Sequence, residues 1–268
     1  GEALQHALKF RWQALWEHID GTFLAVLFAG IATSLLTLAK VLHYFLDTYP
    51  IQLWSFFFGL VIVAAYVVAK EITQWRGRVI LAGLAGIAIA YAVTVITPAQ
   101  TPTDLWFIFL SGSIAICAMI LPGISGSFIL LILGKYEYIL GALNERNLLV
   151  IATFAVGCVV GLLSFARLIS WLLDRYYNTA IALLAGFMIG SLNKIWPWKE
   201  VVSTRMNSSG EEVPFITKNV LPAVYEEVMG QSPYLGQAIL FMLLGAGVVL
   251  AIDLVAARQQ KTAKTVNN

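Results

Sequence analysis

The stretch Leu121-Pro122-Gly123-Ile124-Ser125-Gly126-Ser127 is a short polar turn between two strongly apolar runs, residues 105–120 and 128–143. Proline lacks a backbone N–H and the two glycines permit tight or left-handed backbone, so these residues favour a break in the helix. Backbone groups that a break frees are tolerated in hydrocarbon only where protein or a wet cavity receives them. The sequence therefore predicts a turn at membrane depth that lines a cavity.

The alternative is a Pro/Gly kink in one ordinary transmembrane helix, since both residues are frequent there. The number of helix breakers and hydroxyl groups in this stretch favours the turn instead. A helix that restarts near Ser125 would direct its free N–H groups and the positive end of its dipole at the turn. Such an arrangement favours an anion as the ligand.

The composition of the 268-residue chain is that of a membrane protein. Apolar residues make up 59%, charged residues 12%, and the mean hydropathy is +0.81, whereas about a quarter of the residues in a soluble domain are charged. The net charge of +2 is too small to indicate nucleic acid as a partner. Cys117 and Cys158 both lie in apolar runs, which favours packing roles over a disulfide. The three histidines have no metal-like spacing, and no metal or cofactor is predicted.

Hydropathy predicts an all-α polytopic membrane protein that forms one transmembrane domain over residues 1–268. Residues 1–20 have the make-up of an amphipathic helix in the membrane interface. The hairpin spans residues 105–143, and its short arms leave open both a re-entrant pair and a tightly joined pair of crossings. Residues 199–233 carry mixed charges and form an extramembrane segment, with a turn at Asn207–Gly210 and a short helix near Tyr225. The remaining predicted spans are residues 22–42, 51–69, 79–96, 148–173, 180–195 and 235–257.

The basic residues predict the orientation. The short loops at Asp47 and Asp104 lack Lys and Arg, whereas most other basic residues fall on the opposite side of the membrane, which is then cytoplasmic. Residues 199–233 are external in this arrangement, and both ends of the chain are cytoplasmic. The cations on the cytoplasmic side are Lys9, Arg11, Lys70, Arg76, Arg78, Arg175, Arg258, Lys261 and Lys264.

Arg167 is the second signal of function, because an arginine inside a span costs several kcal/mol unless it finds a partner or water. It either completes an anion site with the hairpin serines or has a structural role, paired with Asp174 or reaching toward the interface. Four weaker candidates share this ambiguity. Lys194 with Asn193 is a ligand or an anchor at the interface, Ser111 lines the cavity or bonds to its own helix, and Glu137 is a solvated charge or a proton-coupling group.

Several longer segments resemble the bacterial polyprenyl-phosphate transporter family, and the resemblance spans nearly the whole chain; they are residues 111–127 with 133–137, 164–173 and 186–198. Members of that family look like inverted-repeat transporters, with one Pro-Gly-x-Ser-Gly hairpin in each half. The match to the second motif and to the arginine after it implies a phosphate site at Pro122, Gly123, Ser125, Gly126, Ser127 and Arg167. The first motif of the family is missing, so the chain is expected to lack an upstream hairpin.

The resemblance implies a flippase that returns undecaprenyl phosphate across the bacterial cytoplasmic membrane for cell-wall precursor synthesis. Its partners would be the polyprenyl-phosphate lipid and membrane lipids, with proton or ion coupling and a homo-oligomer left open. One rival is a membrane polyprenyl-pyrophosphate phosphatase with a Pro-Gly-x-Ser turn, but Gly126 stands where that family has arginine and no paired intramembrane glutamates supply acid and base. The chain is therefore not expected to be an enzyme. A second rival is a non-transporting scaffold or ion channel.

Overall fold

A computed structural model describes residues 21–96, 101–206 and 212–266 of the chain. The chain divides into two compact units, residues 1–53 and residues 54–268. In the first unit, helix α3 (Gly21–Thr48) covers the predicted first span, and helix α4 (Pro50–Lys70) begins there and continues into the second unit. The predicted interfacial helix, residues 1–20, lies outside the described residues.

Four helices that lie wholly or mostly in the described part of the second unit are long and apolar enough to cross a membrane. They are α4, α5 (Gly77–Val95), α9 (Leu148–Ser191) and the Leu235–Gln259 part of α11 (Leu235–Val266). At most 28% of the most apolar window of each span is buried inside the protein, so most of these side chains face outward, as lipid contact requires. The chain is therefore a mainly helical, polytopic membrane protein, and this prediction is confirmed. The shorter helices are α6 (Leu105–Ile120), α7 (Gly126–Ile132) and α8 (Tyr136–Asn144).

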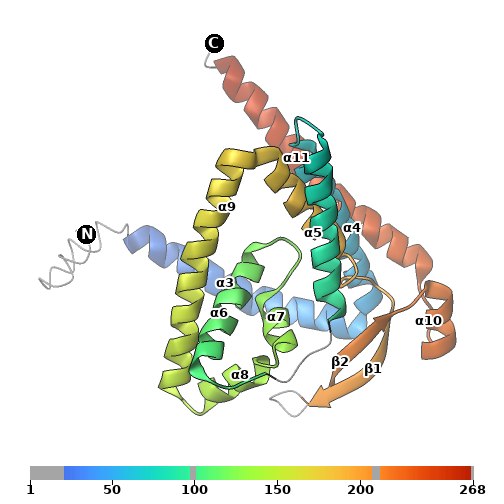
Figure 1. Cartoon of the computed structure of the whole chain (residues 1–268). Coiled ribbons are helices and arrows are strands. Elements are labelled where there is room, and N and C mark those ends of the chain that lie inside the picture. Colours follow the sequence, from blue (N-terminus) through green and yellow to red (C-terminus); the bar gives the residue numbers. More distant parts are fainter. Residues whose placement is uncertain (1–20, 97–100, 207–211, 267–268) are drawn as a thin grey trace, which may run out of the picture. The chain divides into compact units, whose positions relative to one another are not determined.

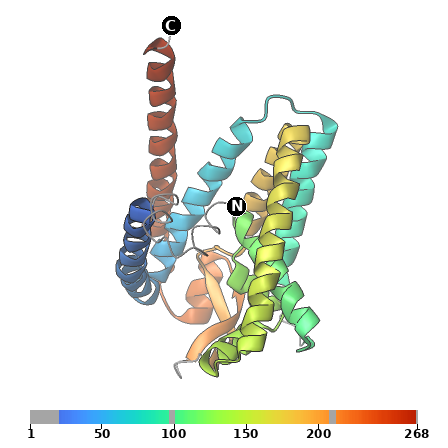
Figure 2. The ribbon, with the colours of Figure 1, turned by 90° about the vertical axis from the view of Figure 1, so that its left-hand side faces the viewer.

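Helix α9 joins the two predicted spans 148–173 and 180–195 into one element that bends sharply (Figures 1 and 2). The bend lies at Tyr176, whose φ of −138° and ψ of 48° are not helical. We call residues 148–175 the first limb of α9 and residues 177–191 its second limb. Just after the bend, the side-chain oxygen of Asn178 accepts a hydrogen bond from the backbone N–H of Thr73 at 3.0 Å. This bond ties the bend to the loop between α4 and α5.

The second limb of α9 packs against α5 through backbone contact at glycines. A Cβ added at Gly186 would lie 2.2 Å from the carbonyl oxygen of Gly83, and one added at Gly190 would lie 2.4 Å from the oxygen of Ile87. Small residues of this kind let transmembrane helices approach closely. The two pairs advance together along the sequence, so α5 and the second limb run parallel.

The first limb of α9 packs against α6 in the same way. A Cβ at Gly157 would lie 2.1 Å from the oxygen of Phe109, and one at Gly161 would lie 2.6 Å from the oxygen of Ser113. The free thiols of Cys117 and Cys158 lie in this interface, 3.6 Å and 3.5 Å from the carbonyl oxygens of Gly161 and Gly112. These contacts fit the packing roles that the sequence predicts for both cysteines.

A two-stranded antiparallel ribbon follows α9, formed by β1 (Lys199–Met206) and β2 (Glu212–Asn219). The indole N–H of Trp196 donates to the carbonyl of Val220 at 2.8 Å, and that of Trp198 donates to Pro233 at 2.9 Å, so two tryptophans anchor the base of the ribbon. Helix α10 (Pro222–Met229) is the predicted short helix near Tyr225. The strands were not predicted, and the predicted turn at Asn207–Gly210 lies outside the described residues.

The glycine contacts predict an asymmetric effect of substitution between α5 and α9. Gly186→Ala would force a methyl group onto the Gly83 carbonyl, whereas Gly83→Ala meets its nearest atom, the oxygen of Ala182, at an ordinary 3.5 Å. Overpacking of this kind costs about 1–3 kcal/mol. We expect Gly186→Ala to lower the midpoint of thermal unfolding in detergent and Gly83→Ala to leave it nearly unchanged. Equal midpoints for the two variants would contradict this packing.

Candidate functional site: a re-entrant hairpin beside a lysine-lined cavity

The Pro122–Ser127 motif forms the turn of a helical hairpin. Gly123 has a φ of +91°, and a Cβ there would lie 2.1 Å from the hydroxyl oxygen of Ser191 at the end of α9. A Cβ on Gly126 would lie 2.8 Å from the carbonyl oxygen of Ala115, so α7 folds back against α6 (Figure 1). Both glycines are required by close approach, and Gly123 also by its left-handed backbone.

Helix α6 stops part-way along α9. Cys117, near the end of α6, contacts Gly161, which lies near the middle of the first limb, and the chain then turns back. The two arms therefore form a helical hairpin whose turn lies beside the middle of the first limb. The second arm differs from the single run expected over residues 128–143, because α7 and α8 meet at 105°. The break falls at Gly134, whose φ of +61° ends α7.

The hairpin serines cap α7. The backbone N–H of Phe128 donates to the hydroxyl of Ser125 at 3.1 Å, and the hydroxyls of Ser125 and Ser127 lie 2.9 Å apart. An N-cap serine of this kind satisfies one of the free N–H groups at a helix start. Both serines are exposed, so their hydroxyls remain accessible to a ligand.

The structure places Arg167 on the exposed surface of the first limb of α9. Gly161 lies beside Ser113 and Cys117, and Arg167 follows Gly161 by less than two turns. Because α6 and the first limb run parallel, Arg167 lies near the level of the Pro122–Gly123 turn. Among the described residues no ion pair joins Arg167 to Asp174.

Ser111 and Glu137, the other two candidate site residues in the hairpin, lie away from its turn. The Ser111 hydroxyl is buried and donates to the carbonyl of Phe107 in its own helix at 2.7 Å. Glu137 is exposed in the first turn of α8. The hairpin turn therefore brings together the residues of the Pro122–Ser127 motif but not Ser111 or Glu137, and Arg167 shares only its level along α9.

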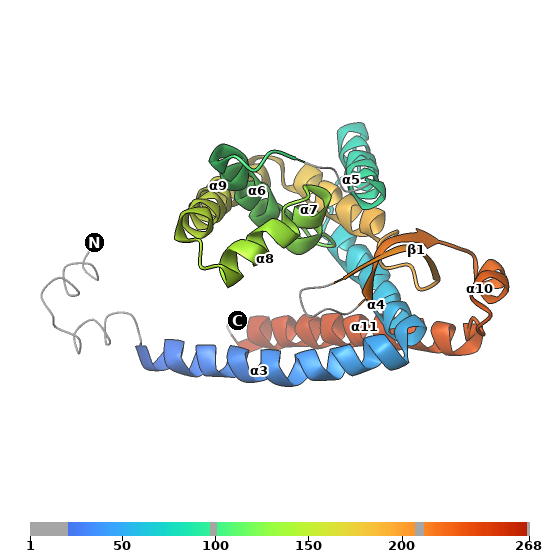
Figure 3. The ribbon, with the colours of Figure 1, turned by 90° about the horizontal axis from the view of Figure 1, so that it is seen from below.

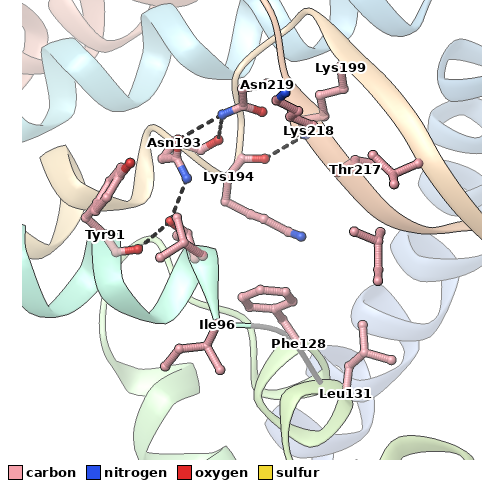
Figure 4. Close-up of a pocket in the computed structure, with 14 residues that line it drawn as sticks. Tyr91, Ile96, Phe128, Leu131, Asn193, Lys194, Lys199, Thr217, Lys218 and Asn219 are labelled. Atoms are coloured by element: carbon pink, nitrogen blue, oxygen red, sulfur yellow. Dashed lines mark hydrogen bonds between the residues drawn. The ribbon is translucent and has the colours of Figure 1, made fainter. Parts of the chain in front are cut away.

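A cavity of 490 Å³ lies beside the hairpin, enclosed by the end of α5, by α7, by the end of α9 and by the ribbon (Figure 4). In Figures 1 and 3, α7 lies between α6 and the ribbon. Asn193 and Lys194, both sequence candidates, line the cavity. Lys199 and Lys218, which sequence reasoning did not single out as site residues, line it as well. Lys199 and Asn219 are directly opposite in the ribbon and share its cavity-facing side, so the side chain of Lys218, one residue along, points to the other face.

Lys194 and Lys199 have no carboxylate among the described residues that line the cavity. Lys194 Nζ lies 4.0 Å from the centroid of the Phe128 ring. Lys199 Nζ donates to the carbonyl oxygen of Lys194 at 2.7 Å and lies 4.1 Å from the Trp54 ring centroid. Lys218, in contrast, stands opposite Glu200 in the ribbon. Aromatic faces attract cations, but they do not neutralise them, so the charge of Lys194 and Lys199 suits an anion as a ligand.

Burial lowers the pKa of Lys194, and burial together with the charge of Lys194 lowers the pKa of Lys199 to about 8. Both causes disfavour the charged ammonium form. An anion bound in the cavity would stabilise both ammonium groups and would therefore raise the pKa values of the two lysines again.

A hydrogen-bond network fixes the polar wall of the cavity (Figure 4). The Asn193 amide donates to the Thr94 hydroxyl at 2.8 Å, and the Asn219 amide donates to the backbone and side-chain oxygens of Asn193 at 2.7 Å and 2.8 Å. These bonds join the end of α5, the end of α9 and strand β2. They hold the end of α9, where Lys194 lies, in place relative to α5 and the ribbon.

Sequence reasoning found the part of the site that follows helical motifs and missed the part on the ribbon. The signal for Lys199 was present, since it follows the Trp196-Pro197-Trp198 segment closely, but the sequence analysis placed it only in the extramembrane segment 199–233. Among the described residues, no group of three or more His, Cys, Asp or Glu side chains could hold a metal ion.

Comparison with known proteins identifies the family. Residues 1–213 match the family described as "Undecaprenyl phosphate translocase-like". This chain belongs to that family. A polyprenyl-phosphate transporter of Vibrio cholerae is 45% identical over 239 residues, which are 89% of this chain and 78% of that protein. A polyprenyl-phosphate transporter of Staphylococcus aureus is 28% identical over 194 residues, 66% of this chain and 69% of that protein. No solved structure is significantly similar to the chain. The resemblance stated from the sequence is confirmed.

The lowered pKa of Lys199 predicts how stability depends on pH. Between pH 8, the pKa in the folded state, and about pH 10.4, the ordinary lysine value, the unfolded chain binds more protons than the folded one. The free energy of unfolding that depends on Lys199 therefore rises with pH across this window. We expect the wild-type protein to gain stability relative to Lys199→Met between pH 7 and pH 10, measured as the difference between their unfolding midpoints. A difference that stays constant with pH would contradict the lowered pKa.

Proposed function

We propose that this protein is a flippase that carries polyprenyl phosphate, such as undecaprenyl phosphate, across the bacterial cytoplasmic membrane. The observation that carries the proposal is a lysine-lined cavity without a carboxylate, placed directly against a helical hairpin. A lipid monophosphate presents a dianion that must cross hydrocarbon, while its tail can stay in the bilayer. The head group alone needs a polar path, and fixed cations and hydroxyls can replace its water.

Two parts of the protein would serve that path. The exposed hydroxyls of Ser125 and Ser127 and the side chain of Arg167 would contact the phosphate at the hairpin turn. The Lys194 side chain would contact it on the other side of α7, where its ammonium lies against Phe128. Membership of the family and the names of the two relatives support this role. Recycling of the lipid for cell-wall precursor synthesis is the process that such transport would serve.

The orientation follows from charge. Lys70 at the end of α4 pairs with Asp253 of α11 at 3.0 Å, and the Thr73–Asn178 bond joins the next loop to the bend of α9. This end of the second unit therefore collects Lys70, Arg76, Arg78 and Arg175. We infer that it is cytoplasmic, so that the ribbon and the cavity lie toward the outside.

Transport is tested with proteoliposomes that hold the full chain and undecaprenyl phosphate. We expect the head group to reach the opposite leaflet faster than in protein-free vesicles, with no phosphate released from the lipid or from its pyrophosphate. Arg167→Gln should slow the initial rate roughly tenfold or more, because a hydrogen bond to a charged group contributes about 1.5–3 kcal/mol.

Arg175→Gln is the matched control, since Arg175 is also an exposed arginine of the first limb but lies at the bend, away from the hairpin turn. It should transport at the wild-type rate. Crossing no faster than in protein-free vesicles would overturn the flippase, and release of phosphate would establish an enzyme instead. An equal loss of transport rate in both arginine variants would contradict a specific role of Arg167 in contacting the phosphate.

A further inference from the structure

The cavity has two chemically different sides. Asn193, Lys199 and Asn219 lie on one side, and Ile96, Phe128 and Leu131 lie on the opposite side (Figure 4). The Lys194 side chain extends between them, with its ammonium over the Phe128 ring. The polar side comes from the end of α9 and the ribbon, and the apolar side comes from the ends of α5 and α7.

The size of the cavity exceeds what a phosphate ion needs. Its 490 Å³ falls within the range of about 300–1,000 Å³ that organic ligands occupy. A free inorganic phosphate would leave the apolar side uncovered and would gain nothing from Phe128 and Leu131. A ligand with a phosphate joined to a short apolar segment would contact both sides.

We propose that this cavity is a binding site for the head of a polyprenyl phosphomonoester, with the phosphate on Lys194 and Lys199 and the first isoprene unit against Phe128 and Leu131. This inference rests on the proposed function, which it deepens: it assigns the ribbon a direct part in substrate binding and adds a site distinct from the hairpin serines. Lys199 lies on β1 and its directly opposite partner Asn219, which bonds to Asn193, lies on β2, so the ribbon must be paired for the site to form.

The ribbon also has the fixed position that a binding surface needs. The Asn219 amide bonds to Asn193, and Lys199 Nζ bonds to the Lys194 carbonyl. Both contacts join the ribbon to the residues that end α9. The cations are therefore held at the cavity before a ligand arrives, which lowers the entropic cost of binding.

The test is equilibrium binding to the purified full chain in lipid nanodiscs, with three probes: farnesyl phosphate, farnesol and inorganic phosphate. We expect farnesyl phosphate to bind at least tenfold more tightly than either of the other two. Lys194→Gln and Lys199→Gln should each weaken the binding of farnesyl phosphate at least tenfold. Lys199→Arg, which keeps the positive charge, should keep most of the affinity. This result would show that substitution at this position does not by itself disrupt the fold. Arg78→Gln, which removes an exposed cation at the start of α5, is the matched control and should bind as the wild type does.

The possible results distinguish three claims: the cavity site, its lipid ligand and the flippase function. Wild-type affinity in both lysine-to-glutamine variants would overturn the cavity site, even if the protein transports the lipid. Inorganic phosphate bound as tightly as farnesyl phosphate would overturn the lipid assignment, since the apolar side would then contribute nothing. Lysine-dependent binding of farnesyl phosphate without transport in proteoliposomes would support the site and overturn the flippase alone.

Discussion

Backbone contact at glycine is the constraint on which the arrangement of the second unit depends. Gly157 and Gly161 set α6 against the first limb of α9, and Gly186 and Gly190 set α5 against the second limb. The first contact determines how far the hairpin turn reaches along α9. The second brings Asn193 beside Thr94, and with it the lysine cavity beside α7.

The hairpin and the cavity are therefore structurally linked, because they share residues and contacts. Ser125 caps α7 by accepting the N–H of Phe128, and the ring of Phe128 lies under the ammonium of Lys194. Gly123 reaches the hydroxyl of Ser191 in the last turn of α9. A shift of the hairpin would therefore displace the end of α9, and a ligand bound to Lys194 would change the contacts at the start of α7.

Much of this could be predicted from local sequence, and some of it could not. Most helix bounds follow from apolar runs between charged or proline-containing loops, and the Pro122–Ser127 turn follows from its breakers. Hydropathy did not show the break at Gly134 in the second hairpin arm or the joining of two predicted spans in α9. The ribbon depends on pairing between residues 199–206 and 212–219, and its strands are short and mixed in polarity, so the hydropathy pattern does not show it. Asn219 comes to bond with Asn193 through that pairing. Arg167 shows the opposite case, since its sequence signal is strong although it lies outside the cavity.

In the proposed orientation the cavity lies toward the outside, which has an electrical consequence. A dianion that left it for the cytoplasm would move against a membrane potential that is negative inside, at roughly 2.3 kcal/mol per charge for each 100 mV. The lysines proposed to hold it are fixed in the protein and would not travel with it. Inward movement of the phosphate would therefore be electrogenic unless cations accompanied it, and a voltage across the membrane would set the balance of the lipid between the two leaflets.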